Sequence, residues 1–376
     1  MIEQSDGDAK RGALRGLTVL DFSTLLPGPI ATLLLAEAGA RVIKIEPPGG
    51  EGGRSRGPRW GSQSASFAML NRGKECIAVD LKDPASRDRV LKMAETADIV
   101  VEQFRPGVMD RLGLGYAALS AINPGIIFCS ITGYGQNGPR ALEAGHDLNY
   151  AGETGLLALS FGNPSAPVQP PAPIGDIGGG AYPAFMNILL ALQERQRTGR
   201  GHHIDVSMAE NIFPFAYAAL AAGFSTGNWP DNQGDLITGA SPRYRLYATR
   251  DGAMLVVAAL EPNFWKTFCD TVALREDLRS PTADPREAIS ELTRIIGSQD
   301  ASTWEGKLQG KDCCVTLMKK MGQAVADPHF IQRGVFAAQV ADADGHSIPA
   351  LPVPIVPAFR VAPSSALPAP SLQSQA

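Results

Sequence analysis

The chain has 376 residues, of which 44% are hydrophobic and 19% charged, and its formal net charge is −4 at pH 7. This length accommodates roughly two domains with a sizeable apolar core, which disfavours a disordered chain. Because basic residues are not in excess, nucleic acid is not expected as a partner.

Strand-like runs alternate with helical patterns in the N-terminal part of the chain. The helical spacing of PGPIATLLLAEAGA separates the first two runs, and a second helix is predicted at 83–97 after an Asp-Pro pair. The strand-like runs lie at 17–21, 41–46, 76–81, 98–103 and 125–131. This alternation predicts an α/β fold with a doubly wound, mostly parallel, Rossmann-like sheet. No GxGxxG fingerprint follows these strands, so the sequence does not predict a dinucleotide site.

A change of pattern in the second half predicts a smaller domain. A polar loop at 227–241 marks the expected boundary. Beyond it, two strands flank a turn at Arg250-Asp251-Gly252, and several helical patterns follow, which indicates an α+β unit. We expect a large domain over 1–225, a small α+β domain over 226–325, and a C-terminal segment over 326–376 that returns to the large domain.

Cysteine usage and apolar runs bear on the compartment. The chain has 5 cysteines and no CxxC pair, which disfavours disulfides and a thiolate zinc site and predicts a reducing compartment. The polar N-terminal segment does not resemble a signal peptide. The longest apolar stretches cover about a dozen residues, short of the ~20 that a membrane span needs. We therefore expect a soluble, cytoplasmic protein with no membrane partner and no metal.

A basic cluster between residues 54 and 74 favours an anionic ligand. Outside this cluster, Arg105 and Arg111 follow the strand at 98–103. Because ligands of a parallel sheet bind at the carboxyl ends of its strands, these residues favour a phosphate-bearing ligand. A solvated basic loop is the alternative. The cluster contains no acidic residue and consists of Arg54, Arg56, Arg59, Arg72 and Lys74.

Asp176 stands just before a glycine run in GDIGGGAYPAF, where a long helix is predicted to begin. One interpretation is a helix N-cap, for which aspartate is a preferred residue. Three consecutive glycines cost a helix about 1 kcal/mol each, so a cap alone does not explain them. Glycines let a ligand approach the backbone, and free N–H groups at a helix start stabilise a developing anion.

Two other titratable residues stand at predicted helix starts. His146 is one of 5 histidines and lies in GHDLNY, where the positive end of a helix opposes its protonation and keeps it basic. A structural histidine is the alternative. Glu261 in EPNF follows a predicted strand, and stabilisation of the helix dipole is the simpler interpretation of its position.

These motifs together resemble the class III CoA-transferase (CaiB/BaiF-type) family, which also contains the α-methylacyl-CoA racemases. The racemase branch is the most similar, because GHDLNY, GDIGGG and EPNF match its three motifs. The resemblance covers most of the chain, through LRGLTVLDFSTLLPGP, RVIKIE, LNRGKECIAVDLKD, VVEQFRPGVMDRLGLG, ITGYGQNGPR, GHDLNY, IGDIGGGAYPAF, TGRGHHIDVSMAE and TRDGAMLVVAALEPNFW.

The resemblance implies a set of binding partners. It implies an acyl-CoA substrate with no separate cofactor, because CoA is part of the substrate, and an interlocked homodimer. Pro47 departs from the family pattern, since an arginine that meets a CoA phosphate often follows KIE. The CoA-binding residues are expected to be Leu70, Arg72, Lys74, Arg105 and Arg111.

The resemblance also implies catalytic roles. His146 and Asp176 are expected to form an acid/base pair on opposite faces of C2 of a 2-methylacyl-CoA, with Glu261 hydrogen-bonded to the histidine. The enolate oxygen is expected on the backbone N–H groups of Gly178 and Gly179.

Two alternatives remain open at this point. In a CoA-transferase, Asp176 is the nucleophile that forms an acyl anhydride, and the histidine has no required role. The loop at 49–70 is more like the transferases in length. The second alternative is a CoA-binding module without activity, because a fold alone does not establish catalysis.

Overall fold

The computed structural model describes residues 12–374, except 62, 161, 164–165 and 362–366. Contacts divide the chain into two units. The sequence predicts boundaries near 225 and 325, whereas the contacts place the second division after Asp327 and the first after Phe213. The first unit comprises Met1–Thr154, Ala172–Phe213 and Pro328–Ala376, and the second Gly155–Pro171 and Pro214–Asp327.

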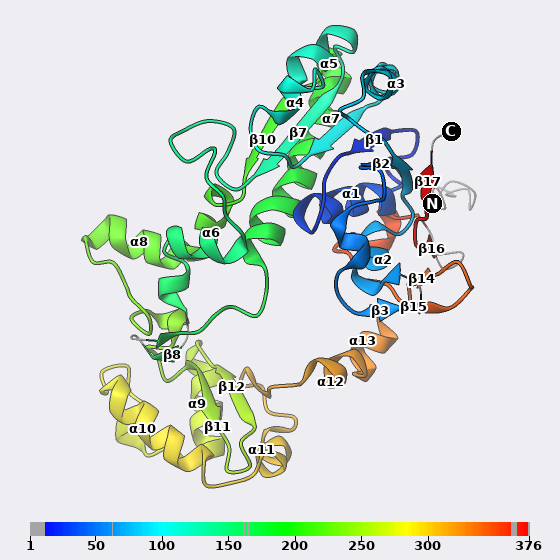
Figure 1. The fold of residues 1–376 in the computed structure, drawn as a ribbon. Helices are drawn as coiled ribbons and strands as arrows, with labels where there is room; N and C mark the ends of the chain where they lie inside the picture. Colours follow the sequence, from blue (N-terminus) through cyan, green and yellow to red (C-terminus); the bar gives the residue numbers. More distant parts are fainter. Residues whose placement is uncertain (1–11, 62, 161, 164–165, 362–366, 375–376) are drawn as a thin grey trace, which may run out of the picture. The chain divides into compact units, whose positions relative to one another are not determined.

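A seven-stranded sheet forms the centre of the first unit (Figure 1). All six strand pairings are parallel. From β5 to β10 the spatial order is that of the doubly wound dinucleotide-binding fold, and β17 adds a strand from the C-terminal segment. The predicted α/β fold is therefore confirmed. In spatial order the strands are β10 (His203–Ser207), β7 (Ile127–Thr132), β6 (Ile99–Glu102), β1 (Thr18–Asp21), β2 (Arg41–Glu46), β5 (Glu75–Ala78) and β17 (Leu372–Ser374).

Helices cover both faces of this sheet. Leu20 of β1 packs in a buried cluster with residues of the helices α3 (Pro84–Ala94), α4 (Val108–Arg111) and α5 (Tyr116–Ile122). The next residue, Asp21, points to the other face and bonds to a residue of α1. The helices on that face are α1 (Pro27–Glu37) and α7 (Tyr182–Thr198).

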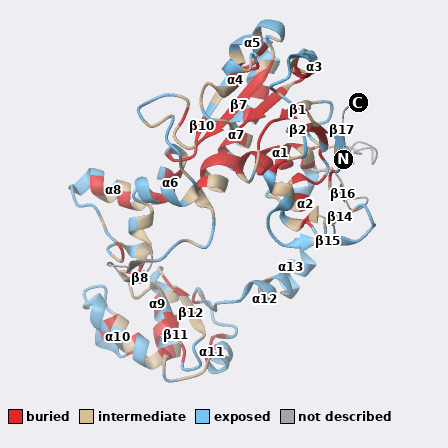
Figure 2. Ribbon diagram, in the orientation of Figure 1, coloured by how far each residue is buried: buried red, intermediate tan, exposed pale blue. Residues whose placement is uncertain are grey.

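Burial on both faces explains the apolar strands. All six residues of β7, IFCSIT, are buried, as expected for a parallel strand that is covered on both sides. Figure 2 shows the sheet as the buried centre of the first unit. The smaller elements of this unit are η1 (Gly52–Ser55), β3 (Arg59–Trp60), β4 (Gln63–Ser64), α2 (Ala65–Asn71), α6 (Asp147–Glu153), η3 (Gly175–Ala181), α13 (Pro328–Gln332), β14 (Gln339–Ala341), β15 (Ser347–Pro349), η7 (Pro357–Phe359) and β16 (Leu367–Pro368).

The second unit is an α+β unit with its own core. Its antiparallel sheet orders β11 (Tyr244–Ala248), β12 (Met254–Ala258) and β13 (Val315–Leu317), and Gly252 takes a positive φ of 78° in the predicted turn. Phe268 packs here with residues of three helices. These helices are α9 (Pro262–Val272), α10 (Pro285–Ile296) and α11 (Ala301–Leu308).

The remaining segments complete the second unit. They are η2 (Leu157–Leu159), β8 (Gly162–Asn163), β9 (Ala166–Pro167), α8 (Tyr217–Thr226), η5 (Leu236–Thr238), η6 (Glu276–Leu278) and α12 (Met321–Val325), while η4 (Glu210–Ala216) spans the division between the units. None of the helices in the described part of the chain combines the length and apolarity that crossing a lipid bilayer requires.

Candidate active site

A cavity of about 430 Å³ lies at the carboxyl ends of four strands of the large sheet. Its lining includes Leu25 and Pro27 after β1, Gln103–Pro106 after β6, Ile131–Gly133 at the end of β7, and Met208 after β10. β1 and β6 are neighbours, and the chain winds away from them in opposite directions. Ligands of doubly wound sheets bind at this switch point, so the cavity is the expected place for a substrate.

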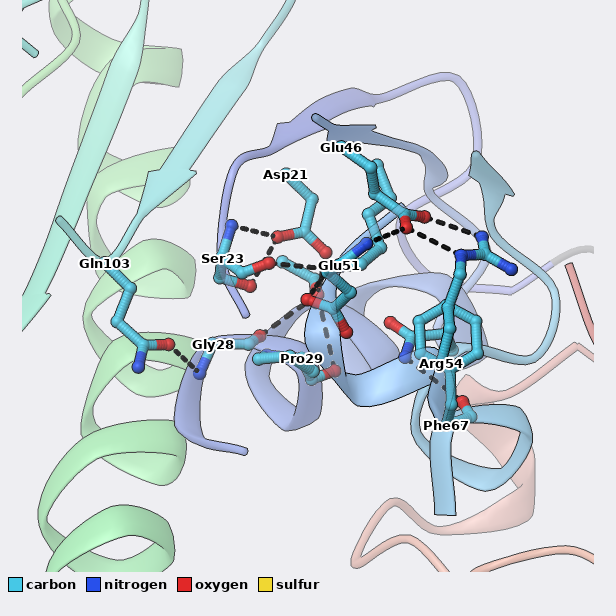
Figure 3. Close-up of polar contacts among 12 residues, drawn as sticks. Asp21, Ser23, Gly28, Pro29, Glu46, Glu51, Arg54, Phe67 and Gln103 are labelled. Atoms are coloured by element: carbon cyan, nitrogen blue, oxygen red, sulfur yellow. Dashed lines mark hydrogen bonds and ion pairs between the residues drawn. The ribbon is translucent and has the colours of Figure 1, made fainter. Parts of the chain in front are cut away.

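A side-chain bridge fixes the two central segments of the cavity. The Oε1 atom of Gln103 accepts a hydrogen bond of 3.1 Å from the backbone N–H of Gly28, the second residue of α1 (Figure 3). A Cβ atom on Gly28 would lie 2.1 Å from the Cβ of Ser23, so only glycine fits there. The start of α1 is therefore held beside the end of β6.

His146 lines this cavity and begins a helix, as the sequence predicts. It is the N-cap residue of α6, and its backbone N–H donates to Oδ1 of Asn149 over 3.0 Å. The hydroxyl of Tyr150 donates to the carbonyl of Gly145 over 2.7 Å, which ties the preceding loop to the helix. The imidazole is exposed. The backbone is thus fixed on both sides of an exposed side chain that lines the cavity.

Asp176 also lines the cavity, but its N-cap interpretation is wrong. It lies inside the first turn of a π-helical segment, η3, whose N-cap is Ile174 and which continues directly into α7. Pro183 lacks an N–H, so a regular helix would leave the carbonyl of Gly179 without a donor. The Nδ2 atom of Asn211 donates to that carbonyl over 3.0 Å. A side chain from another segment thus stabilises the irregular helix.

Packing accounts for two of the three consecutive glycines. A Cβ atom on Gly179 would lie 2.3 Å from the carbonyl oxygen of Met208, and one on Gly180 would lie 3.0 Å from its Cγ. These glycines admit the segment after β10 rather than leaving open space for a thioester. The role of the Gly178 and Gly179 N–H groups as donors to an enolate stays a prediction.

The environment of the Asp176 carboxyl favours its protonated form. Burial, and then the negative charge of Asp147, raise its pKa to about 6, against an opposing effect of His146. Oδ1 of Asp147 accepts a hydrogen bond of 2.9 Å from the backbone N–H of Asp176. A carboxyl that titrates near neutral pH beside an imidazole in one cavity can exchange protons with a bound ligand in both directions.

The amino-acid sequence matches the model of CoA-transferase family III over residues 14–374. The chain belongs to this family. The α-methylacyl-CoA racemase of Homo sapiens is 30% identical over 354 residues, which cover 93% of this chain and 89% of the relative. The acetyl-CoA:oxalate CoA-transferase of Acetobacter aceti is 36% identical over 308 residues, 78% of this chain and 77% of the relative.

A solved structure of the same family has the same fold. The crystal structure of a CaiB/BaiF family protein from Brucella suis has a TM-score of 0.78 and 28% identity, covering 92% of this chain and 93% of that chain. The relatives are named for two different reactions, racemisation and CoA transfer. Membership of CoA-transferase family III therefore leaves the reaction to be inferred from the site.

The expected CoA-binding residues of this family member lie in different places. Arg105 is exposed and lines the cavity, so it is available to an anionic ligand there. Arg111 is exposed on α4 and Leu70 is half-buried on α2. Neither of these two is among the described residues that line the cavity.

The structure corrects the expected roles of Arg72 and Lys74, because both side chains are fully buried. Lys74 Nζ bonds to Oδ2 of Asp21 at 3.2 Å and to Oγ1 of Thr32 at 2.7 Å, and burial lowers its pKa to about 8. Arg72 bonds through Nε to Glu37 Oε1 at 2.8 Å. These cations are matched by buried carboxylates and are closed to a phosphate.

The carboxylate of Asp21, which pairs with Lys74, belongs to a larger polar network beneath α1 (Figure 3). Ser23 donates to Oδ1 of Asp21, and the Nζ atom of Lys44 lies 3.4 Å from Oε2 of Glu51. Arg54, another member of the basic cluster, forms two hydrogen bonds of 2.7 Å to Glu46. Two members of the cluster therefore pair with carboxylates at the carboxyl ends of strands, Lys74 at β1 and Arg54 at β2.

We expect the substitution Arg72→Met to lower stability rather than ligand affinity. The guanidinium also donates to the carbonyls of Met69 and Leu351, so its loss leaves buried acceptors unpaired and costs about 3 kcal/mol. Urea unfolding measures this cost, and calorimetry of the folded variant measures its affinity for CoA. The matched control Arg197→Met removes an exposed arginine and leaves both quantities unchanged. A tenfold weaker CoA affinity at unchanged stability would restore the ligand role of Arg72.

Glu261 belongs to the second unit. It is the N-cap residue of α9, and its side chain is exposed. Its hydrogen bond to His146 stays a prediction.

Two residues of the site were not identified from the sequence. Gln103 carries a signal, because it ends the predicted strand at 98–103 and faces the carboxyl edge of the sheet. Asp147 stands next to His146 in the GHD motif, but its bond to Asp176 joins residues far apart in the chain. No local pattern reveals that contact.

Proposed function

We propose that this member of CoA-transferase family III is an α-methylacyl-CoA racemase that interconverts (2R)- and (2S)-2-methylacyl-CoA. The observation that carries the proposal is that His146 and Asp176 line one cavity at the switch point of the sheet. The near-neutral pKa of Asp176, about 6, suits a group that must both take and give a proton.

The chemistry is a 1,1-proton transfer through an enolate. The thioester acidifies the hydrogen on C2, and one of the two residues removes it while the C2–H electron pair moves into the enolate. The other residue then delivers a proton to the opposite face of C2. His146 acts on one face and Asp176 on the other, and the order reverses for the other enantiomer. No separate cofactor takes part, because the CoA thioester is itself the activating group.

Backbone and basic residues complete the proposed site. The N–H groups of Gly178 and Gly179 would donate to the enolate oxygen, where a lost donor typically costs about 10²–10³ in rate. Arg105 is the cation best placed for a CoA phosphate, since it is exposed in the cavity lining. Glu261 would hold one imidazole tautomer and stabilise the imidazolium.

CoA transfer is the second candidate, favoured by the 36% identity to the Acetobacter aceti CoA-transferase. In that reaction a carboxylate oxygen of Asp176 attacks the thioester carbonyl, the CoA thiolate leaves, and an acyl anhydride remains on the aspartate. The thiolate attacks the aspartyl carbonyl of this anhydride, which releases the first carboxylate and leaves CoA on Asp176 as a thioester. The second carboxylate attacks that thioester and frees the thiolate, forming a new anhydride. The thiolate then attacks the acyl carbonyl of the new anhydride, which gives the new acyl-CoA and restores Asp176. His146 has no required step in this sequence.

Proton NMR in D₂O with (2R)-2-methylacyl-CoA separates the two reactions. With no carboxylic acid acceptor present, racemisation predicts deuterium at C2 together with loss of optical purity. If the α-proton stays unchanged on several acyl chains, the racemase proposal is wrong. Formation of a new thioester with an added acceptor, and trapping of acylated Asp176 by hydroxylamine, would then establish transfer.

We further propose that the protein is a homodimer, interlocked as in the family it belongs to. Helix α7 exposes a row of apolar side chains at helical spacing, with Met186 54%, Leu189 36% and Leu190 67% exposed. An apolar helix face of this kind supports a protein contact. Light scattering is expected to give about twice the chain mass of 39.7 kDa. The variant Leu190→Glu is expected to weaken the dimer, and a monomer mass for the unchanged protein would refute the proposal.

A further inference from the structure

Asp147 joins the two elements that carry the proposed acid/base pair. It is the first residue of α6 and follows His146 directly in the chain. Its Oδ1 accepts the backbone N–H of Asp176, the second residue of η3, over 2.9 Å. A Cβ atom on Gly175 would lie only 3.1 Å from the same oxygen, so the carboxylate packs closely against this turn. One side chain therefore spans the junction of α6 with η3.

Burial raises the pKa of the Asp176 carboxyl most, and the negative charge of the Asp147 carboxylate raises it further, while His146 acts in the opposite direction. Tyr150 lies on the same helix as Asp147. Burial raises the pKa of its phenol, and the nearby charge of Asp176 raises it further. Arg105 lines the same cavity from the segment after β6.

We propose that Asp147 is a positioning residue for Asp176, which fixes the backbone of Asp176 through a hydrogen bond and by its negative charge disfavours ionisation of the Asp176 carboxyl. This inference rests on the proposed acid/base role of Asp176. The two effects come from different properties of one side chain. The hydrogen bond requires an acceptor oxygen, whereas the effect on ionisation requires a negative charge. Substitutions can therefore separate them.

The variant Asp147→Asn keeps an amide oxygen for the N–H of Asp176 and removes the charge. We expect the acid limb of the pH profile of kcat/KM for deuterium exchange to move to lower pH by about one unit. We expect the ¹³C resonance of the Asp176 carboxyl, assigned with Asp176→Asn, to titrate at lower pH by the same amount. The variant Asp147→Ala loses both properties, so it should show the same shift together with a lower kcat.

A matched control removes a charge from the other end of the same helix. Glu153 is the last residue of α6 and is exposed, and its carboxylate bonds to Tyr134. Glu153→Gln is expected to leave the pH profile and the titration of Asp176 unchanged. An unmoved profile and an unmoved titration in Asp147→Asn would overturn the inference. If the unchanged protein exchanges no α-proton, the racemase proposal fails, while the carboxyl titration still decides the role of Asp147.

Discussion

The substitution His146→Ala is expected to abolish racemisation of 2-methylacyl-CoA. Removal of a general acid/base typically costs about 10²–10⁴ in rate, and here the lost imidazole is the only group proposed for one face of C2. Asp176 still serves the other face. Deuterium should therefore enter C2 of one enantiomer with retention of configuration and should not enter the other. Chiral chromatography together with proton NMR in D₂O measures both outcomes.

The control for this experiment is a second exposed histidine outside the cavity. His202 precedes β10, and its side chain is 48% exposed beside Glu194. His202→Ala is expected to leave racemisation and folding unchanged. Full exchange and inversion in His146→Ala would show that this imidazole carries no proton. An unchanged rate of CoA transfer in the same variant would support the transferase alternative.

Local sequence patterns predict five of the seven strands of the large sheet, but not β10 or β17, and they predict the helix that follows His146. Strands buried on both faces are continuous apolar runs, and β7 shows this over its whole length. The start of α6 follows from the GHDLNY motif, which contains the N-cap residue His146 and the first residues of the helix. Features that depend on neighbours in the chain can therefore be predicted.

Features that depend on partners far away in the chain cannot be predicted from local patterns. The cluster from Arg54 to Lys74 contains no acidic residue, yet its two fully buried cations pair with carboxylates 35 residues away at Glu37 and 53 residues away at Asp21. Counting charges along this stretch of sequence predicts an unpaired basic surface, whereas folding brings the carboxylates into contact with the cations. The π-helix has the same origin, because its stability depends on Asn211, 32 residues beyond Gly179.

The substitution Asp176→Asn is expected to abolish both racemisation and CoA transfer and to stabilise the fold above neutral pH. The pKa of this carboxyl is about 6 in the folded chain and 3.8 in the reference state. Between these values the folded chain binds a proton that the unfolded chain releases, so stability falls as pH rises through this window. Above it, the ionised carboxylate costs the folded state about 1–3 kcal/mol, which the amide avoids. Urea unfolding at about pH 8 and about pH 4 measures the difference, which should be absent at the lower pH.

The variant Asp83→Ala is a control in which the expected change in stability at high pH has the opposite sign. Asp83 is the N-cap residue of α3, and hydrogen bonds from the side chain of Ser86 and from its backbone N–H, the latter over 2.8 Å, lower the pKa of its carboxyl. Its ionised form stabilises the fold, and this contribution is lost as pH falls below the unfolded value. Asp83→Ala should therefore be less stable than the unchanged chain at about pH 8, where Asp176→Asn is more stable. If Asp176→Asn instead destabilises the fold at both pH values, the Asp176 side chain stabilises the folded chain. The predicted cost of its ionised form above neutral pH is then wrong.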